Sequence, residues 1–465
     1  MRTRLLLPIT FFVLLATSFA QQLSPDLKSK IDDTAHQVLA ATGVPSASIA
    51  AVKDGQVVYT QAYGDARVEP KLAASTNMRY GVGSISKQFT AAAILLLQEQ
   101  GKLKLDDPVG KYLPELTRAN EVTIRQLLSH TSGYQDYWPQ DYLMPFILKP
   151  TTPKKIMDQW ARKPLDFDPG TKWQYSNTNF TIAGAIIEKI SGKPILQFLT
   201  DNIFRPLGMH SVLDIDETHP TETDAVGYLR YALGPPRVAP LEGKGWMFAA
   251  GELYMTPVDL AKWNISMINQ SVLKPASYKE MQTEVKLKNG EGTHYGLGVS
   301  VFNERGHRIV EHSGEVSGFV AENIVLPDDK IAITVLTNQD ASSAASQIGD
   351  RITSYLVPSQ QDSASSNADL DRARKVFEEL QQGRIDRSQF TDDANFYFTE
   401  QALQDFASSL GPLGAIQEFT ANRTSLRGGM TYRGYRAKVG GKQLSISIYE
   451  IPDGKYEQYL VEPRE

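Results

Sequence analysis

The pattern of apolar and polar positions up to residue 357 places strands at both ends of a mostly helical middle. Apolar or alternating runs at 46–52 and 56–63 flank the turn sequence Asp54-Gly55 and so predict a β-hairpin. Further strands are predicted at 298–302, 308–312, 319–326 and 331–336. Because the strands flank the helices, we expect one sheet made from both ends of this region, with the helical part inserted between them.

One predicted helix is apolar on nearly every side and should lie inside the protein. It contains Ala91–Leu97, an unbroken run of apolar helix formers. Gly81 and Gly83 allow the backbone to turn sharply into this helix, so we expect Ser84 at its N-terminus and Lys87 on the same face. Other helices are predicted before Gly43, at 122–128, 153–161, 179–190 and 194–203, from Thr256 onward, and at 342–355.

The polar stretch 358–368 predicts a linker to a second, smaller domain. Helical patterns and then strand patterns with Gly-Gly and Pro-Asp-Gly turns follow it. The helices are predicted at 369–382 and 400–409, and the strands near 416–424, 430–438, 443–450 and 455–461. We therefore expect an α+β domain at 369–465, which loosely resembles the small NTF2-like or cystatin-like domains.

The N-terminus has the pattern of a signal peptide at 1–20. Arg2 and Arg4 precede the apolar run Leu5–Leu15, and Ser18-Phe-Ala20 fits a small-x-small cleavage site. The apolar run is too short to span a bilayer well. We therefore expect an exported protein, periplasmic or secreted, with no integral membrane span after processing; an uncleaved anchor is the alternative.

Composition narrows the function classes. The chain of 465 residues is 41% hydrophobic and 22% charged, as in ordinary globular proteins, and its net charge of −5 gives no electrostatic basis for binding nucleic acid. It contains no cysteine, which excludes disulfides, thiol catalysis and a lipid-modified cysteine anchor. The histidines show no metal-ligand spacing, so we expect neither a metal nor another cofactor.

Ser84-x-x-Lys87 is the candidate for nucleophilic chemistry, because a buried amine beside a hydroxyl can make a serine nucleophilic. A second match, Ser271-x-x-Lys274, has no glycine before it and Pro275 after it, so it does not open a buried helix. Two further motifs add weight to the first. Tyr175-x-Asn177 lies between a loop and a predicted helix, and His312-Ser-Gly314 ends a predicted strand.

In this order the three motifs resemble those of the class C β-lactamase and penicillin-binding-protein-like serine hydrolase family. Three other segments are also similar to family landmarks: Leu127-Leu-Ser-His-Thr-Ser-Gly133, Pro206-Leu-Gly-Met209 and Tyr295-Gly-Leu-Gly298. The resemblance covers roughly residues 25–357, within a catalytic domain that we place at 21–357. It implies an α/β (α+β) fold in which an antiparallel sheet is flanked by helices and carries an inserted helical domain.

The resemblance also implies a role for each motif residue. Ser84 would attack the carbonyl and carry the acyl group, and Lys87 would accept its proton, alone or with Tyr175. Asn177 would bind Lys87 and the substrate amide. The backbone N–H groups of Ser84 and Glu315 would form the oxyanion hole, and the remaining motif residues, His312, Ser313 and Gly314, would face the substrate's carboxylate or leaving group.

Energies test this assignment. A free lysine has a pKa of about 10.4, whereas a useful base titrates near about 7–8, a difference of roughly 4 kcal/mol. A helix dipole contributes about 0.3–1 kcal/mol and at most about 2 kcal/mol. Desolvation must therefore supply most of the change, and the apolar run after Lys87 agrees with that.

One motif residue departs from the β-lactamase pattern. Class C β-lactamases carry lysine where this chain has His312, while histidine also occurs there in related D-amino-acid peptidases and esterases. We therefore favour a serine hydrolase acting on small esters or peptides over a β-lactam hydrolase. We also expect recognition to depend on pH near 6–7, where histidine titrates.

Two hypotheses from other classes stay open. A non-catalytic sensor could keep the fold, and the main role could lie in the C-terminal domain as a ligand-binding module. For His130 we expect a hydrogen bond that braces a loop rather than a catalytic role. The aromatic residues in 134–142, and Trp246 and Phe248, are predicted either to line the cleft or to pack loops.

Overall fold

The computed structural model describes residues 23–140, 142–218, 220–304, 307–357, 368–427 and 430–464. The predicted signal peptide and nearly all of the predicted linker lie outside these residues. Within them, no helix combines the length and the apolar composition needed to cross a membrane.

A central antiparallel sheet joins strands from both ends of the region 46–337, as predicted. Its strand order is β3-β2-β1-β12-β11-β10-β9, so the N-terminal hairpin lies beside the last strand of the region. The strands are β1 Ser46–Lys53, β2 Gln56–Arg67, β3 Leu72–Ala73, β9 Ser300–Glu304, β10 His307–Val316, β11 Phe319–Leu326 and β12 Ile331–Thr337. The central strands β1 and β12 are buried almost throughout, because both faces of the sheet are covered.

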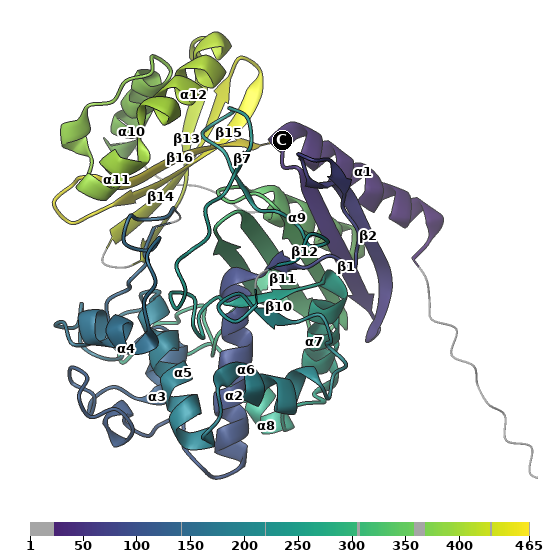
Figure 1. Cartoon of the computed structure of the whole chain (residues 1–465), viewed down its shortest axis with the longest axis vertical. Coiled ribbons are helices and arrows are strands. Elements are labelled where there is room, and N and C mark those ends of the chain that lie inside the picture. Colours follow the sequence, from purple (N-terminus) through teal and green to yellow (C-terminus); the bar gives the residue numbers. More distant parts are fainter. Residues whose placement is uncertain are drawn as a thin grey trace, which may run out of the picture.

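Helices cover the sheet on both sides (Figure 1). One face packs on α1, Pro25–Thr42, and α9, Ala344–Leu356, in one apolar cluster. The other face packs on the helical region, whose core is a second, larger cluster. The helices of that region are α2 Ser86–Glu99, α3 Ile124–Leu128, α4 Pro153–Ile156, α5 Asn177–Ser191, α6 Ile195–Leu199, α7 Pro257–Asn269 and α8 Pro275–Met281.

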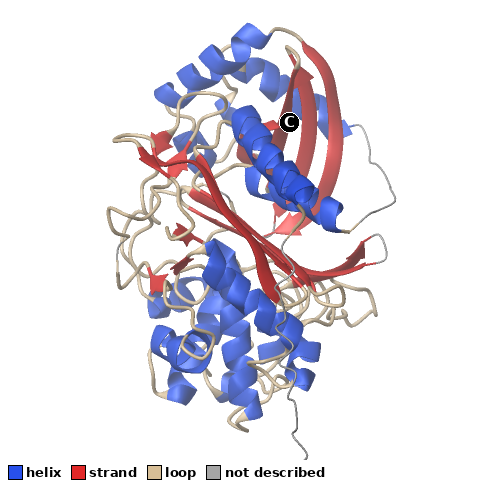
Figure 2. Ribbon diagram, turned by 90° about the vertical axis from the view of Figure 1, so that its right-hand side faces the viewer, coloured by secondary structure: helices blue, strands red, loops and turns tan. Residues whose placement is uncertain are grey.

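The C-terminal domain lies on the side of the sheet opposite the helical region (Figure 2). It has helices α10 Ala368–Leu380, α11 Asp392–Tyr397 and α12 Glu400–Leu410 on a sheet of strands in sequence order. Those strands are β13 Ile416–Arg427, β14 Met430–Val439, β15 Lys442–Glu450 and β16 Tyr456–Arg464. The sequence prediction missed α11, although Thr391 caps it and two acidic residues occupy its first turn.

Two of the boundaries that differ from the predictions concern the candidate site. Ser84 does not open the α-helix itself: it lies in a single 3₁₀ turn, Gly83–Ile85, and α2 begins at Ser86. The strand predicted to end at the His312 motif continues to Val316, because Gly314 keeps its pairing with β11.

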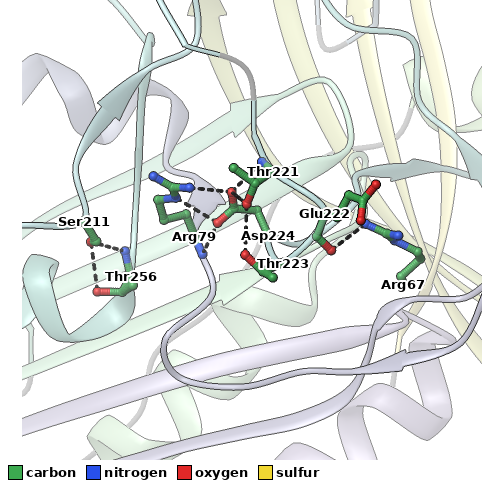
Figure 3. Close-up of polar contacts among 8 residues, drawn as sticks. All are labelled: Arg67, Arg79, Ser211, Thr221, Glu222, Thr223, Asp224 and Thr256. Atoms are coloured by element: carbon green, nitrogen blue, oxygen red, sulfur yellow. Dashed lines mark hydrogen bonds and ion pairs between the residues drawn. The ribbon is translucent and has the colours of Figure 1, made fainter.

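A polar cluster anchors the strand that leads into the serine turn (Figure 3). Arg79 precedes the short strand β4, Tyr80–Gly81, and its Nε and a terminal guanidinium nitrogen lie 2.8 and 2.6 Å from the Asp224 carboxylate. Thr221 donates to the same carboxylate at 2.9 Å, and Arg67 of β2 donates to the neighbouring Glu222 carbonyl at 2.8 Å. This cluster therefore ties the connection around residue 222 to both the sheet and β4.

Candidate active site

Ser84 and Lys87 lie close together at the N-terminal end of α2. Lys87 is fully buried, and its Nζ lies 2.9 Å from Ser84 Oγ. Nζ also donates to Asn177 Oδ1 at 2.8 Å and to the Ala250 carbonyl at 2.7 Å. The amide and carbonyl oxygens can only accept, whereas the contact with Ser84 can reverse direction when Nζ loses a proton. The amine is therefore held where its lone pair would point at the serine hydroxyl.

Asn177, the first residue of α5, is fixed by Asp136 as well as by Lys87. Its backbone N–H and its Nδ2 donate to Asp136 Oδ1 at 2.9 and 3.1 Å, and Nδ2 also donates to the Trp138 carbonyl at 3.2 Å. Because these acceptors use Nδ2, the network assigns the amide orientation. Asn177 thus binds Lys87 as expected, but its side-chain N–H groups point at protein acceptors rather than at a substrate amide.

Tyr175 lies beside the Ser84–Lys87 pair. Lys87 Nζ is 5.0 Å from the centroid of the Tyr175 ring, and the His130 ring packs against the same ring at a centroid distance of 4.2 Å. His130 is fully buried, and its Nδ1 accepts the backbone N–H of Ser176 at 3.1 Å. His130 therefore braces the loop that presents Tyr175, the role expected for it from the sequence.

Two glycines allow β10 to reach the serine turn. A Cβ on Gly314 would lie 1.9 Å from the Val82 carbonyl oxygen and 3.1 Å from the Ser84 nitrogen. A Cβ on Gly83, which has φ +50°, would lie 2.6 Å from the Glu315 nitrogen. Only glycine fits such a close backbone approach. The nitrogens of Ser84 and Glu315 are consequently neighbours at the place where an oxyanion hole is expected.

His312 is buried and held at both ring nitrogens. Its Nδ1 lies 2.5 Å from the Ser313 carbonyl oxygen, and its Nε2 lies 2.8 Å from the hydroxyl of Tyr295. The carbonyl can only accept, so Nδ1 carries a hydrogen, and in the neutral form of the ring Nε2 accepts from Tyr295. Burial raises the pKa of Tyr295 well above its ordinary value, which keeps its hydroxyl a donor. Ser313, next in β10, is exposed.

The candidate site contains one cavity of about 330 Å³. Ser84, Tyr175, Asn177, His312, Ser313 and Glu315 all line it, as do Tyr137, Trp138 and Tyr142. Tyr134 packs instead, donating to the Thr117 carbonyl at 2.9 Å, and Trp246 packs against Tyr137. Phe248, the last of the aromatic residues in question, packs against the larger apolar cluster.

Sequence reasoning missed several parts of this site. Asp136 and the Ala250 carbonyl hold the Lys87–Asn177 pair, yet neither belongs to a motif. Gln140 lines the cavity from the 134–142 loop, and Tyr432 and Tyr449 line it from the C-terminal domain. Only Asp136 carried a local signal, since its side chain accepts the N–H of Trp138 two residues on, an Asx turn.

The second Ser-x-x-Lys match lies elsewhere. Ser271 and Lys274 are exposed near the start of α8, outside the cavity. Among the described residues, no group of three or more histidine, aspartate or glutamate side chains is arranged to hold a metal ion.

Known proteins share the family and the fold of this chain. The family model described as Beta-lactamase matches residues 31–355. Penicillin-binding protein 4* of Bacillus subtilis (strain 168) is 30% identical over 315 residues, which are 64% of this chain and 69% of that protein. The D-amino acid amidase structure from Ochrobactrum anthropi SV3, complexed with L-phenylalanine amide, is 26% identical with a TM-score of 0.62, over 71% of this chain and 97% of that one.

One further structure resembles the chain in fold over almost its whole length. The octameric penicillin-binding protein homologue from Pyrococcus abyssi has a TM-score of 0.63 and 24% identity, and the match covers 94% of this chain and 99% of that chain. The family match takes in well over half of the sequence and includes all three motifs. The chain therefore belongs to the beta-lactamase family of serine hydrolases.

Proposed function

We propose that the protein hydrolyses small esters or amides through an acyl-serine intermediate on Ser84. The observation that carries the proposal is the position of the buried Lys87 amine, 2.9 Å from Ser84 Oγ and held by two oxygens that can only accept. Relatives named as penicillin-binding proteins and D-amino acid amidases support acyl transfer on amide substrates.

The steps follow from these contacts. The Ser84 hydroxyl gives its proton to the neutral Lys87 amine while Oγ bonds to the carbonyl carbon. The carbonyl oxygen gains the charge, and the N–H groups of Ser84 and Glu315 would stabilise it. Collapse breaks the bond to the leaving amine or alcohol, which takes a proton from Lys87 or Tyr175. Water then attacks the acyl group by the same route and restores the serine.

Within this class we favour esterase or D-amino-acid peptidase activity. His312 stands where class C β-lactamases carry lysine, and the described residues that line the cavity include no permanent cation to bind a β-lactam carboxylate. We also propose that the protein is exported, with a signal peptide cleaved after Ala20, which N-terminal sequencing of the purified protein would test.

The function is tested with one panel of compounds. A fluorophosphonate probe, a short-chain aryl ester, D-alanyl peptides and a chromogenic cephalosporin are applied to wild type, Ser84→Ala and Ser271→Ala. We expect labelling and ester or peptide turnover in wild type and Ser271→Ala, and neither in Ser84→Ala. The exposed Ser271 is a matched control because it belongs to the other Ser-x-x-Lys sequence.

Each alternative has its own signature in this panel. Cephalosporin turnover faster than ester or peptide turnover would establish a β-lactam hydrolase instead. A folded wild-type protein that shows neither labelling nor turnover would establish the non-catalytic sensor.

A further inference from the structure

The charges along the cavity wall have one sign. Three carboxylates line it: Glu311 and Glu315 of β10, and Asp340, which follows β12. Among the described residues no arginine or lysine lines the cavity, and the Lys87 amine lies behind Ser84 with its acceptors. A cavity of this charge attracts cations and repels carboxylates.

Two of the carboxylates lie together beside the expected oxyanion hole. Glu315 Oε1 accepts the backbone N–H of Ala341 at 2.7 Å, and Asp340 Oδ2 accepts the N–H of Gly318 at 3.0 Å. Asp340 and Ala341 are adjacent in the chain, so the Glu315 and Asp340 side chains both lie at the C-terminal end of β10. Because the backbone nitrogen of Glu315 is a neighbour of the Ser84 nitrogen, this acidic end lies close to the position of a scissile carbonyl.

A buried amide in the same wall has no protein partner. Gln140 is 1% exposed and lines the cavity, and neither its Oε1 nor its Nε2 has a hydrogen-bond partner among the described residues. A buried polar group without a partner is destabilising, so such a group in a cavity wall indicates a polar ligand. Its oxygen can accept from a cationic N–H group.

The C-terminal domain supplies an aromatic wall to the cavity. Tyr432 of β14 and Tyr449 of β15 line it, with their ring centroids 5.3 Å apart. The tyrosine faces carry the negative part of the ring quadrupole, which attracts ammonium groups.

Resting on the proposed function, we infer that the cavity selects substrates with a positively charged amino group near the scissile carbonyl, held by Glu315 and Asp340. Such substrates are amides or esters of amino acids with a free amino group. Glu311, four residues earlier on β10, adds to the negative field of the cavity. Burial raises the pKa of Asp340 to about 7, against the lowering by the Gly318 N–H and with a further rise from Glu242. A bound ammonium group would favour the ionised form of Asp340.

Binding tests the inference without turnover. The Ser84→Ala variant is titrated calorimetrically with three probes of similar size: 2-phenylethylammonium, 2-phenylethanol and 3-phenylpropanoate. We expect the cation to bind at least tenfold more tightly than the alcohol and the carboxylate not to bind measurably. Equal affinity of cation and alcohol, or tighter binding of the carboxylate, would overturn the inference whether or not the enzyme is active.

Turnover supplies the second arm. D-phenylalanine p-nitroanilide is compared with its N-acetyl and N-succinyl derivatives, and we expect kcat/KM to favour the free amine at least tenfold. Asp340→Asn should reduce this preference at least threefold, while Asp453→Asn, at an exposed turn, should leave it unchanged. Ser84-dependent turnover that favours the neutral or anionic derivative would overturn the inference but keep the proposed function. If no ester or anilide is turned over, the proposed function fails, and the binding arm then decides on the cation site.

Discussion

At the scale of single residues, the proposed chemistry depends on how Lys87 is held. Its two fixed acceptors, Asn177 Oδ1 and the Ala250 carbonyl, come from segments far apart in the sequence. Asp136 fixes Asn177 in turn, through its backbone N–H and its Nδ2. The direction of the Lys87 amine is thus set by residues that do not touch Ser84. A change in one of them can displace the amine slightly from the serine hydroxyl, and such a displacement lowers the rate of catalysis.

Asp136 can therefore be tested as a positioning residue. We expect Asp136→Ala to lower kcat roughly 10- to 100-fold with a smaller change in KM, because Asn177 loses the acceptor that orients it. Asp136→Asn keeps one oxygen as acceptor for the Asn177 backbone N–H and should restore part of kcat. Steady-state kinetics on an aryl ester measure both. Equal rates for Asp136→Ala and Asp136→Asn would contradict the positioning role.

His312 is the residue through which pH should act on turnover. Protonation adds a second ring N–H, so the hydroxyl of Tyr295 would have to accept at Nε2 rather than donate. We expect kcat/KM of wild type to change across pH 5–8, where histidine titrates, and the profile of His312→Gln to be flatter. A wild-type profile that is flat from pH 5 to 8 would contradict the prediction.

At the scale of elements, the site depends on one backbone contact between β10 and the turn before α2. Gly83 lies against β10, and Gly314 of β10 lies against the turn. Neither position has room for a side chain. The turn before α2 and β10 are distant in sequence, so this contact sets the distance between Ser84 and the residues of β10 that line the cavity.

Gly314→Ala should separate the two elements. The added methyl would meet the Val82 carbonyl, so we expect at least a hundredfold loss of kcat/KM and destabilisation of about 1–3 kcal/mol. Gly192→Ala is the control: its φ is +69° but no atom lies within 4 Å of the added Cβ. That variant should lose only about 1–2 kcal/mol of stability and no activity. Chemical denaturation and ester kinetics decide, and full activity in Gly314→Ala would refute the close contact.

At the scale of the whole molecule, the two domains share buried surface. Ala232, in the loop between β6, Tyr228–Leu229, and β7, Arg237–Val238, is 3% exposed within the apolar core of the C-terminal domain. The Arg237–Asp405 ion pair at 2.9 Å and the hydrogen bond from Tyr142 to the Glu457 carbonyl at 2.9 Å lie at the same boundary. The catalytic domain thus completes the core of its neighbour.

Because of this shared core, we expect the two domains to unfold together. Wild type should give one calorimetric transition, and Ala232→Asp should split it, because the variant buries an unpaired charge in the contact. Ala232→Gly is the matched control, since the φ of +50° at this position suits glycine. A single transition in Ala232→Asp with unchanged midpoint would show that the contact contributes nothing.

The stability of the whole molecule should also depend on pH through a buried carboxylate pair. Burial raises the pKa of Glu252 well above its ordinary value, and the Asp214 carboxylate raises it further; burial likewise raises the pKa of Asp214. An acid with a higher pKa in the folded state holds its proton more tightly there, so stability falls as pH rises from about 4.5 through the raised pKa.

Glu252→Gln removes this titration. At pH 8 the variant should be more stable than wild type, and the gap should shrink toward pH 5, where wild-type Glu252 keeps its proton. Thermal unfolding at the two pH values measures the gap, with the exposed Glu291→Gln as control. A gap of equal size at both pH values would contradict the pKa assignment.

The sequence by itself determined the elements and the family. Apolar periodicity predicted the hairpin, the buried helix and the strands 319–326 and 331–336 within a few residues, because these signals are local. The three motifs identified the family before any geometry was available, since their residue types and order are specific in combination.

Only the tertiary structure decided how the site is completed. Several parts of the site come from segments that no local pattern connects. They are Asp136, which orients Asn177, the Ala250 carbonyl, which accepts from Lys87, and the tyrosines of the C-terminal domain. The extension of β10 past Gly314 depends on its pairing with β11, which the pattern of β10 alone does not report. Patterns along a chain report what each segment prefers, whereas a cavity is defined by which segments fold against one another.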